Sequence, residues 1–113
     1  VDGSDVRWKK DIKGLVDSIN IITGLRGVSY KWRVDEFENM NWDDREHIGL
    51  IAQEVEKVVP EIVTTDEKGF KQLAYGRITP LLIESVKYLK EENDNIKLEL
   101  ASMWEKIEEI KEL

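Results

Sequence analysis

The chain contains no cysteine and a single histidine among its 113 residues. Without cysteine there is no disulfide framework and no thiolate metal site, and one histidine, His47, cannot build a histidine-rich zinc site. We therefore expect neither a metal nor a cofactor. Long hydrophobic runs are also missing, as is a basic segment followed by an apolar one at the amino terminus. The sequence accordingly predicts no membrane span and no signal peptide.

The chain also has fewer basic than acidic residues. The 17 lysine and arginine residues face 24 acidic residues, which gives a formal net charge of −7. The resulting field repels phosphate backbones, so nucleic acid is not an expected partner. The hydrophobic content of 41% and the four tryptophans argue against intrinsic disorder. We expect a folded chain with about one small domain.

Short periodic segments fill the first 80 residues. Some carry apolar residues at helical spacing, and others alternate apolar with polar residues as half-buried strands do. We expect, in chain order, a helix over 11–25, a strand over 28–34, a short buried segment over 48–51, a helix ended by Pro60 and a β-hairpin over 61–75. The sequence thus predicts an α+β fold with a small mixed head, built from short helices and β-hairpins, over residues 1–80.

The clearest pattern follows Pro80, where apolar residues recur at alternating four- and three-residue steps. The series is Leu82, Val86, Leu89, Asn93, Ile96, Leu100, Met103, Ile107 and Ile110. This heptad repeat predicts a coiled-coil helix over 81–113, because a helix that long cannot bury such a seam against itself. Asn93 stands at an a position, where a polar residue fixes the register of the helices. Two alternatives are an antiparallel hairpin and a helix docked on the head.

The charges that flank the seam do not settle how the helices are oriented. Glu92 and Lys97 lie where they can pair between parallel neighbours, whereas Lys106 and Lys111 in the equivalent places repel. The seam residues themselves do not distinguish a dimer from a trimer. The sequence pattern therefore predicts self-association without specifying the number of chains.

Four segments resemble one known family. The first is the run SDVRWKKDI, which starts at Ser4; the others are 27–32, 47–55 and 59–63, and the likeness continues through 75–89 into the coiled coil. These segments resemble the intramolecular chaperone auto-processing domains at the carboxyl end of phage endosialidases, tailspikes, neck appendages and related fibres. The same domain type occurs in a eukaryotic membrane-bound transcription factor. Four motifs in the same order are a specific signal, and they cover nearly the whole chain.

The resemblance implies an assembly. It implies a parallel homotrimeric coiled coil and a partner in an upstream fibre or appendage domain of the same polypeptide. The absence of a nucleic-acid or membrane partner is expected from the charge and the lack of long hydrophobic runs, not from the resemblance. The implied location is the virion, as part of a tail fibre precursor made in the host cytoplasm and used in host attachment. The domain would be released after cleavage.

The resemblance also implies a reaction. In that family a serine of the opening motif and a lysine five residues later form a catalytic dyad, and the bond before the serine is cut. Carried over by position, Ser4 is the nucleophile, Lys9 is the base and Gly3–Ser4 is the cleavage site. Lys10 is the alternative base if the register differs by one. The chain would then be a self-cleaving serine peptidase that acts once.

This reaction requires a particular environment around Ser4 and Lys9, which a structure can test. A serine hydroxyl needs a neighbour to take its proton, and a lysine does so only when neutral, which burial or nearby cations favour. Trp8 and Trp32 are candidates for the apolar surroundings that exclude water from Lys9. Arg7 and Lys10 are candidates for the nearby cations that favour its neutral form. The oxyanion donor is either a set of backbone N–H groups or Gln53, and the sequence does not choose between them.

The spacing of the dyad adds a further demand. Residues five apart on a straight strand point to opposite faces. The chain must therefore bend between Ser4 and Lys9, or the lysine must come from a neighbouring subunit. Two rival interpretations remain: a non-catalytic trimerisation cap in which Ser4 only caps a helix, and the equivalent domain of a membrane-bound transcription factor.

Overall fold

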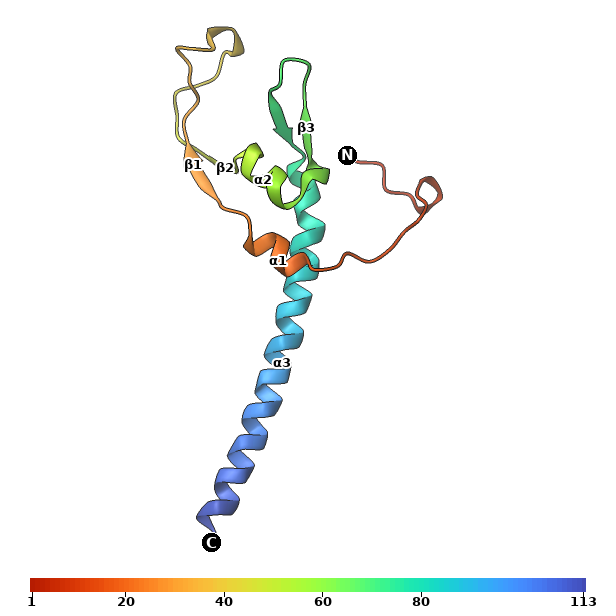
Figure 1. Ribbon diagram of the computed structural model, residues 1–113, viewed down its shortest axis with the longest axis vertical. Helices are drawn as coiled ribbons and strands as arrows, with labels where there is room; N and C mark the ends of the chain where they lie inside the picture. The colour runs from red at the N-terminus through yellow and green to blue at the C-terminus, as the bar shows by residue number, and fades with distance from the viewer.

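The computed structural model describes all 113 residues as a head of short elements from which one long helix extends (Figure 1). This helix, α3, runs over Ile78–Lys111. The radius of gyration is 22.1 Å, against about 13 Å for a compact chain of similar length. The molecule is therefore markedly elongated, with extents of 78 × 40 × 24 Å.

The head consists of short helices and two separate hairpins. In chain order its elements are η1 (Val6–Trp8), α1 (Ser18–Thr23), β1 (Val28–Tyr30), η2 (Glu38–Met40), β2 (His47–Gly49), α2 (Ala52–Val58), η3 (Pro60–Ile62), β3 (Val63–Thr65), β4 (Lys71–Leu73) and η4 (Tyr75–Arg77). Strand β1 pairs antiparallel with β2, with Ser29 opposite Ile48, and β3 pairs antiparallel with β4. The predicted α+β head followed by a long helix is confirmed.

The core of the head is small. Its buried apolar residues are Val55 in α2, Val59 between α2 and η3, Ile62 in η3 and Leu81 near the start of α3. The accessible surface is 10129 Å², whereas a compact protein of 13.2 kDa exposes about 6,400 Å². A single chain thus leaves a large surface uncovered, and much of that surface is apolar.

The predicted helix over 11–25 is too long. Helix α1 begins only at Ser18, because Asp17 has φ +60° and Asp11 has φ +55°, which are left-handed conformations that interrupt a helix. Leu15 and Val16, which fitted the helical spacing, are exposed instead. Residues 1–17 form an extended segment, which we call the arm.

Two strand predictions also need correction. The strand over 28–34 ends at Tyr30, and the segment over 48–51 is not uniformly buried. Ile48 is 89% exposed because it pairs with Ser29 on the outer face of the first hairpin. The helix before Pro60 and the hairpin over 61–75 are confirmed by α2 and by β3 and β4.

The far end of the first hairpin carries stacked aromatic rings. Trp32 stacks on Trp42 with ring centroids 4.4 Å apart, and His47 lies 5.9 Å from Trp32 between ring centroids. The His47 ring shares a hydrogen bond of 2.8 Å with Asp43, whose carboxylate also accepts from the backbone N–H of Arg45. These bonds lower the pKa of Asp43 to about 2, and the bond with His47 has the largest effect. His47 is therefore part of a structural cluster.

The seam of α3 is not covered by the head. Helix α1 packs against the face of α3 that carries Leu81 and Ser85, which are the two buried residues of the helix. The apolar seam residues from 82 to 110 are between 39% and 66% exposed. The alternatives of a seam docked on its own head and of a helical hairpin are therefore wrong, since α3 is one uninterrupted helix. No helix of the chain has the length and apolar character needed to cross a membrane.

Candidate active site

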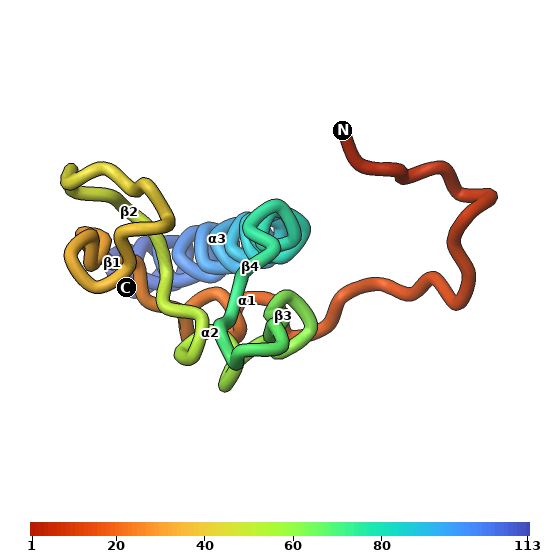
Figure 2. Tube along the Cα trace, turned by 90° about the horizontal axis from the view of Figure 1, so that it is seen from above, coloured from red at the N-terminus to blue at the C-terminus, as the bar shows by residue number.

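The arm lies apart from the rest of the head. It leaves α1 on the side opposite to β1 and β2, as both views show (Figure 1, Figure 2). All of its residues are exposed except Asp5, which is half-buried. The arm therefore presents its side chains to solvent, or to another chain, rather than to its own core.

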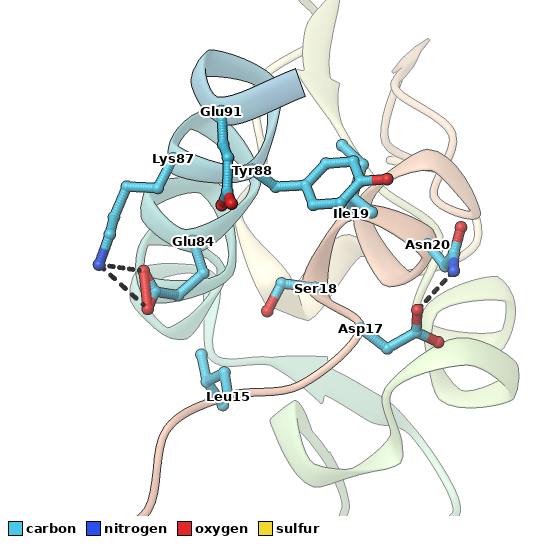
Figure 3. Close-up of a pocket in the computed structure, with 9 residues that line it drawn as sticks. All are labelled: Leu15, Asp17, Ser18, Ile19, Asn20, Glu84, Lys87, Tyr88 and Glu91. Atoms are coloured by element: carbon cyan, nitrogen blue, oxygen red, sulfur yellow. Dashed lines mark hydrogen bonds and ion pairs between the residues drawn. The ribbon is translucent and has the colours of Figure 1, made fainter. Parts of the chain in front are cut away.

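The end of the arm is fixed where it meets α1 and α3. Leu15 and Ser18 face the first turns of α3 across a pocket of about 430 Å³ (Figure 3). On the α3 side, the Lys87 ammonium pairs with Glu84 at 3.1 Å, and the Tyr88 ring lies beside α1. The arm thus joins the head at the buried Ser18, the first residue of α1.

A single turn interrupts the arm near its free end. Asp5 caps the 3-10 helix η1, because its carboxylate accepts a hydrogen bond of 2.8 Å from the backbone N–H of Arg7. The backbone N–H of Trp8 donates to the carbonyl of Asp5 at 3.1 Å, and that of Lys9 donates to Val6 at 3.2 Å. Aspartate before a helix is a common cap for this reason. On a straight strand the side chains of Ser4 and Lys9 would point to opposite faces. The turn instead lets them point toward each other.

Arg7 strengthens the same turn. Its Nε and its terminal nitrogen donate to the two carboxylate oxygens of Asp5 at 3.1 and 2.8 Å. The side-chain hydrogen bonds from Arg7 lower the pKa of Asp5, and its backbone N–H adds to this effect. The pKa of Arg7 is raised by the same pairing. Arg7 therefore remains cationic but is paired with the Asp5 carboxylate.

The turn brings the predicted dyad together. Lys9 Nζ donates a hydrogen bond of 2.7 Å to Ser4 Oγ. Both residues belong to one chain, so the bend that the spacing requires exists within a single chain. The partner of Ser4 is Lys9 rather than the adjacent Lys10. Both dyad residues are exposed in the single chain.

The other residues considered from sequence lie in different places. Trp8 packs against Gly3 in the arm, whereas Trp32 belongs to the aromatic cluster of the first hairpin and is not brought to Lys9 within one chain. Gln53 lies in α2 and lines an apolar groove between the two hairpins. No cluster of three or more acidic or histidine side chains is positioned to hold a metal ion.

The sequence did not predict the pair of side-chain hydrogen bonds from Arg7 to Asp5, which we call the clamp, or the contact between Gly3 and Trp8. A signal for the clamp was present, since an aspartate followed two residues later by an arginine suits a capped turn. A signal for the glycine contact was not, because it depends on where the turn directs the tryptophan ring.

The comparison with protein families bears on this arrangement directly. Residues 4–64 match the family model described as chaperone of endosialidase. The match begins at Ser4 and covers more than half of the chain. The chain belongs to the chaperone of endosialidase family. The start of the match coincides with the part of the arm that contains the turn and the hydrogen bond between Lys9 and Ser4.

Two relatives within phage fibres extend the comparison. The chain is 33% identical over 103 residues to the long tail fiber protein Gp37 of Salmonella phage S16, which covers 88% of this chain and 14% of that protein. It is 36% identical over 72 residues to the protein of the same name from Escherichia phage AR1, which covers 62% and 6%. The chain thus corresponds to a small part of each relative.

Proposed function

We propose that the chain is the intramolecular chaperone of a phage tail fibre protein: it drives trimeric assembly of the fibre domain that precedes it and then releases itself by cutting the Gly3–Ser4 bond. Membership of the chaperone of endosialidase family and the likeness to two tail fibre proteins support the chaperone role and a place in a virion precursor. The observation that carries the cleavage is the 2.7 Å hydrogen bond between Lys9 and Ser4.

The chaperone role follows from the uncovered seam. Three parallel copies of α3 bury their seams against one another, as heptad helices do. Bundling holds the attached fibre chains at high local concentration and in a common register, so their folding becomes effectively intramolecular. The large accessible surface of the single chain supports the same assembly, because a head with so small a core gains stability from neighbours.

The cleavage proceeds by transfer of an acyl group and then by hydrolysis. Lys9 takes the hydroxyl proton of Ser4 as Oγ forms a bond to the carbonyl carbon of Gly3. The carbon–nitrogen bond between Gly3 and Ser4 breaks, and the nitrogen receives the proton from Lys9. Water then hydrolyses the ester, which leaves a carboxylate on Gly3 and an amino-terminal Ser4 with its hydroxyl restored.

Assembly switches this reaction on. Lys9 has to be neutral to accept a proton, and removal of a lysine from water favours its neutral form. Val6, Trp8, Ile12 and Val16 give the arm an exposed apolar surface that a neighbouring subunit covers in the trimer. Covering the arm removes water from Lys9 and favours its neutral form. Cleavage therefore waits until the three chains have assembled.

The test uses a precursor that carries upstream fibre residues. We expect the wild-type precursor to separate into two fragments, and Ser4→Ala and Lys9→Ala to give one uncut, trimeric product. Lys10→Ala is the matched control, because it removes the adjacent lysine, and it should cleave as the wild type does. Persistent cleavage in both dyad variants would refute the mechanism. A trimeric but uncut wild type would instead establish the chain as a permanent trimerisation cap.

A further inference from the structure

The ring of Trp8 leaves no room for a side chain at residue 3. A methyl group built on the Cα atom of Gly3 would lie 2.9 Å from Cζ3 and 3.3 Å from Cε3 of Trp8. Carbon atoms in favourable contact are about 3.5–4.0 Å apart. The backbone of Gly3 is not in the left-handed region, since Gly69 is the glycine with positive φ. Space under the ring, rather than backbone conformation, is what favours glycine here.

We propose that Trp8 is a specificity-determining residue that restricts the position before the nucleophile to glycine. The inference rests on the proposed cleavage of the Gly3–Ser4 bond, because that makes Gly3 the residue whose carbonyl is attacked. The ring lies against one side of this glycine. Trp8 is 76% exposed in the single chain, and Gly3 is a residue that its ring meets within the arm.

The turn couples the ring to the base. Trp8 and Lys9 are consecutive residues, and both are held by backbone hydrogen bonds to Asp5 and Val6. A side chain at residue 3 has to push the indole ring outward, and that displacement is passed to the next residue of the same short turn. Lys9 then loses its 2.7 Å contact with Ser4. A misplacement of about 1 Å at a reacting centre can reduce a rate by about 10²-fold.

A series of substitutions at residue 3 tests the selection. We expect Gly3→Ala to slow single-turnover cleavage of the trimeric precursor about tenfold or more, and Gly3→Val to slow it further. Gly14→Ala is the control, since it adds the same methyl group to the arm at a glycine with no atom within 4 Å of the added carbon. The readouts are the rate at which the fragment starting at Ser4 appears, by mass spectrometry, and the oligomeric state of each variant, by sedimentation. Equal rates for Gly3 and its variants would overturn the proposal.

A double-substitution cycle assigns the effect to the ring. In a Trp8→Ala background, whatever its own rate, Gly3→Ala should change that rate less than about twofold, because no ring remains to be displaced. Trp8→Leu provides a second background that keeps an apolar side chain. If Gly3→Ala slows all three backgrounds by the same factor, Trp8 does not select glycine. If the wild type is not cut before Ser4 at all, the proposed cleavage itself fails, whatever the role of Trp8.

Discussion

Replacing Leu100 with alanine removes an apolar side chain from the seam of α3. Leu100 is 53% exposed in the single chain, and a neighbouring helix of the bundle is expected to cover the remainder. Leu98, two residues away on the same helix, is 70% exposed but stands at an outward position of the heptad. Leu98→Ala is therefore a matched control, with the same change of side chain and the same change of helix propensity.

The magnitude follows from the exposed fraction. Complete burial of a leucine contributes about 1.5–3 kcal/mol, so covering the remaining half is worth about 1 kcal/mol per chain and about 3 kcal/mol for three chains. Since about 1.4 kcal/mol corresponds to a factor of ten, Leu100→Ala should raise the trimer dissociation constant about 10²-fold. The cavity left in the seam adds to this loss. Leu98→Ala should leave the dissociation constant almost unchanged.

Sedimentation equilibrium over a range of protein concentrations measures the effect. The account predicts a trimer for the wild type and for Leu98→Ala, and dissociation of Leu100→Ala at concentrations where both remain assembled. Equal behaviour of the two variants would show that the heptad seam is not the contact surface. A wild type that stays monomeric at high concentration would refute the reasoning from the outset.

Three further predictions concern the arm and the head. Asp5→Asn weakens the bidentate contact with Arg7 and should slow cleavage of the precursor while leaving its trimer intact, as mass spectrometry and sedimentation will show. Gly49→Ala places a methyl group 2.7 Å from the hydroxyl of Tyr75 and should lower the free energy of unfolding in urea by about 1–3 kcal/mol. The pKa of Asp43 is lowered to about 2 when folded, so its hydrogen bonds stabilise the first hairpin above about pH 4. That stability is lost as pH falls toward about 2, and tryptophan fluorescence should report the loss in the wild type but not in Asp43→Asn.

The architecture was largely predictable because its strongest signals are local in the sequence. A heptad seam from Leu82 onward specifies a long helix by period alone, and the helix before Pro60 and the hairpin over 61–75 have their own breakers and turns. The same reasoning overextended the first helix. Leu15 and Val16 have helical spacing, but Asp17 adopts a left-handed conformation that separates them from α1.

The site was predictable only in part. The family motif pointed to Ser4 and Lys9, and the structure places their side chains within hydrogen-bond distance. The bend between them depends on one turn of three residues, which is too short to produce a periodic signal. The position of Trp32 could not be predicted, because Trp42 stacks on it from the far side of a loop.

The mass of the fragment released from a precursor with upstream fibre residues tests the central claim most directly. The account predicts that trimeric wild-type precursor yields a product whose first residue is Ser4, and that Ser4→Ala stays intact as an equally stable trimer. A wild-type trimer that remains at its full mass, or a new amino terminus at any other residue, would contradict it.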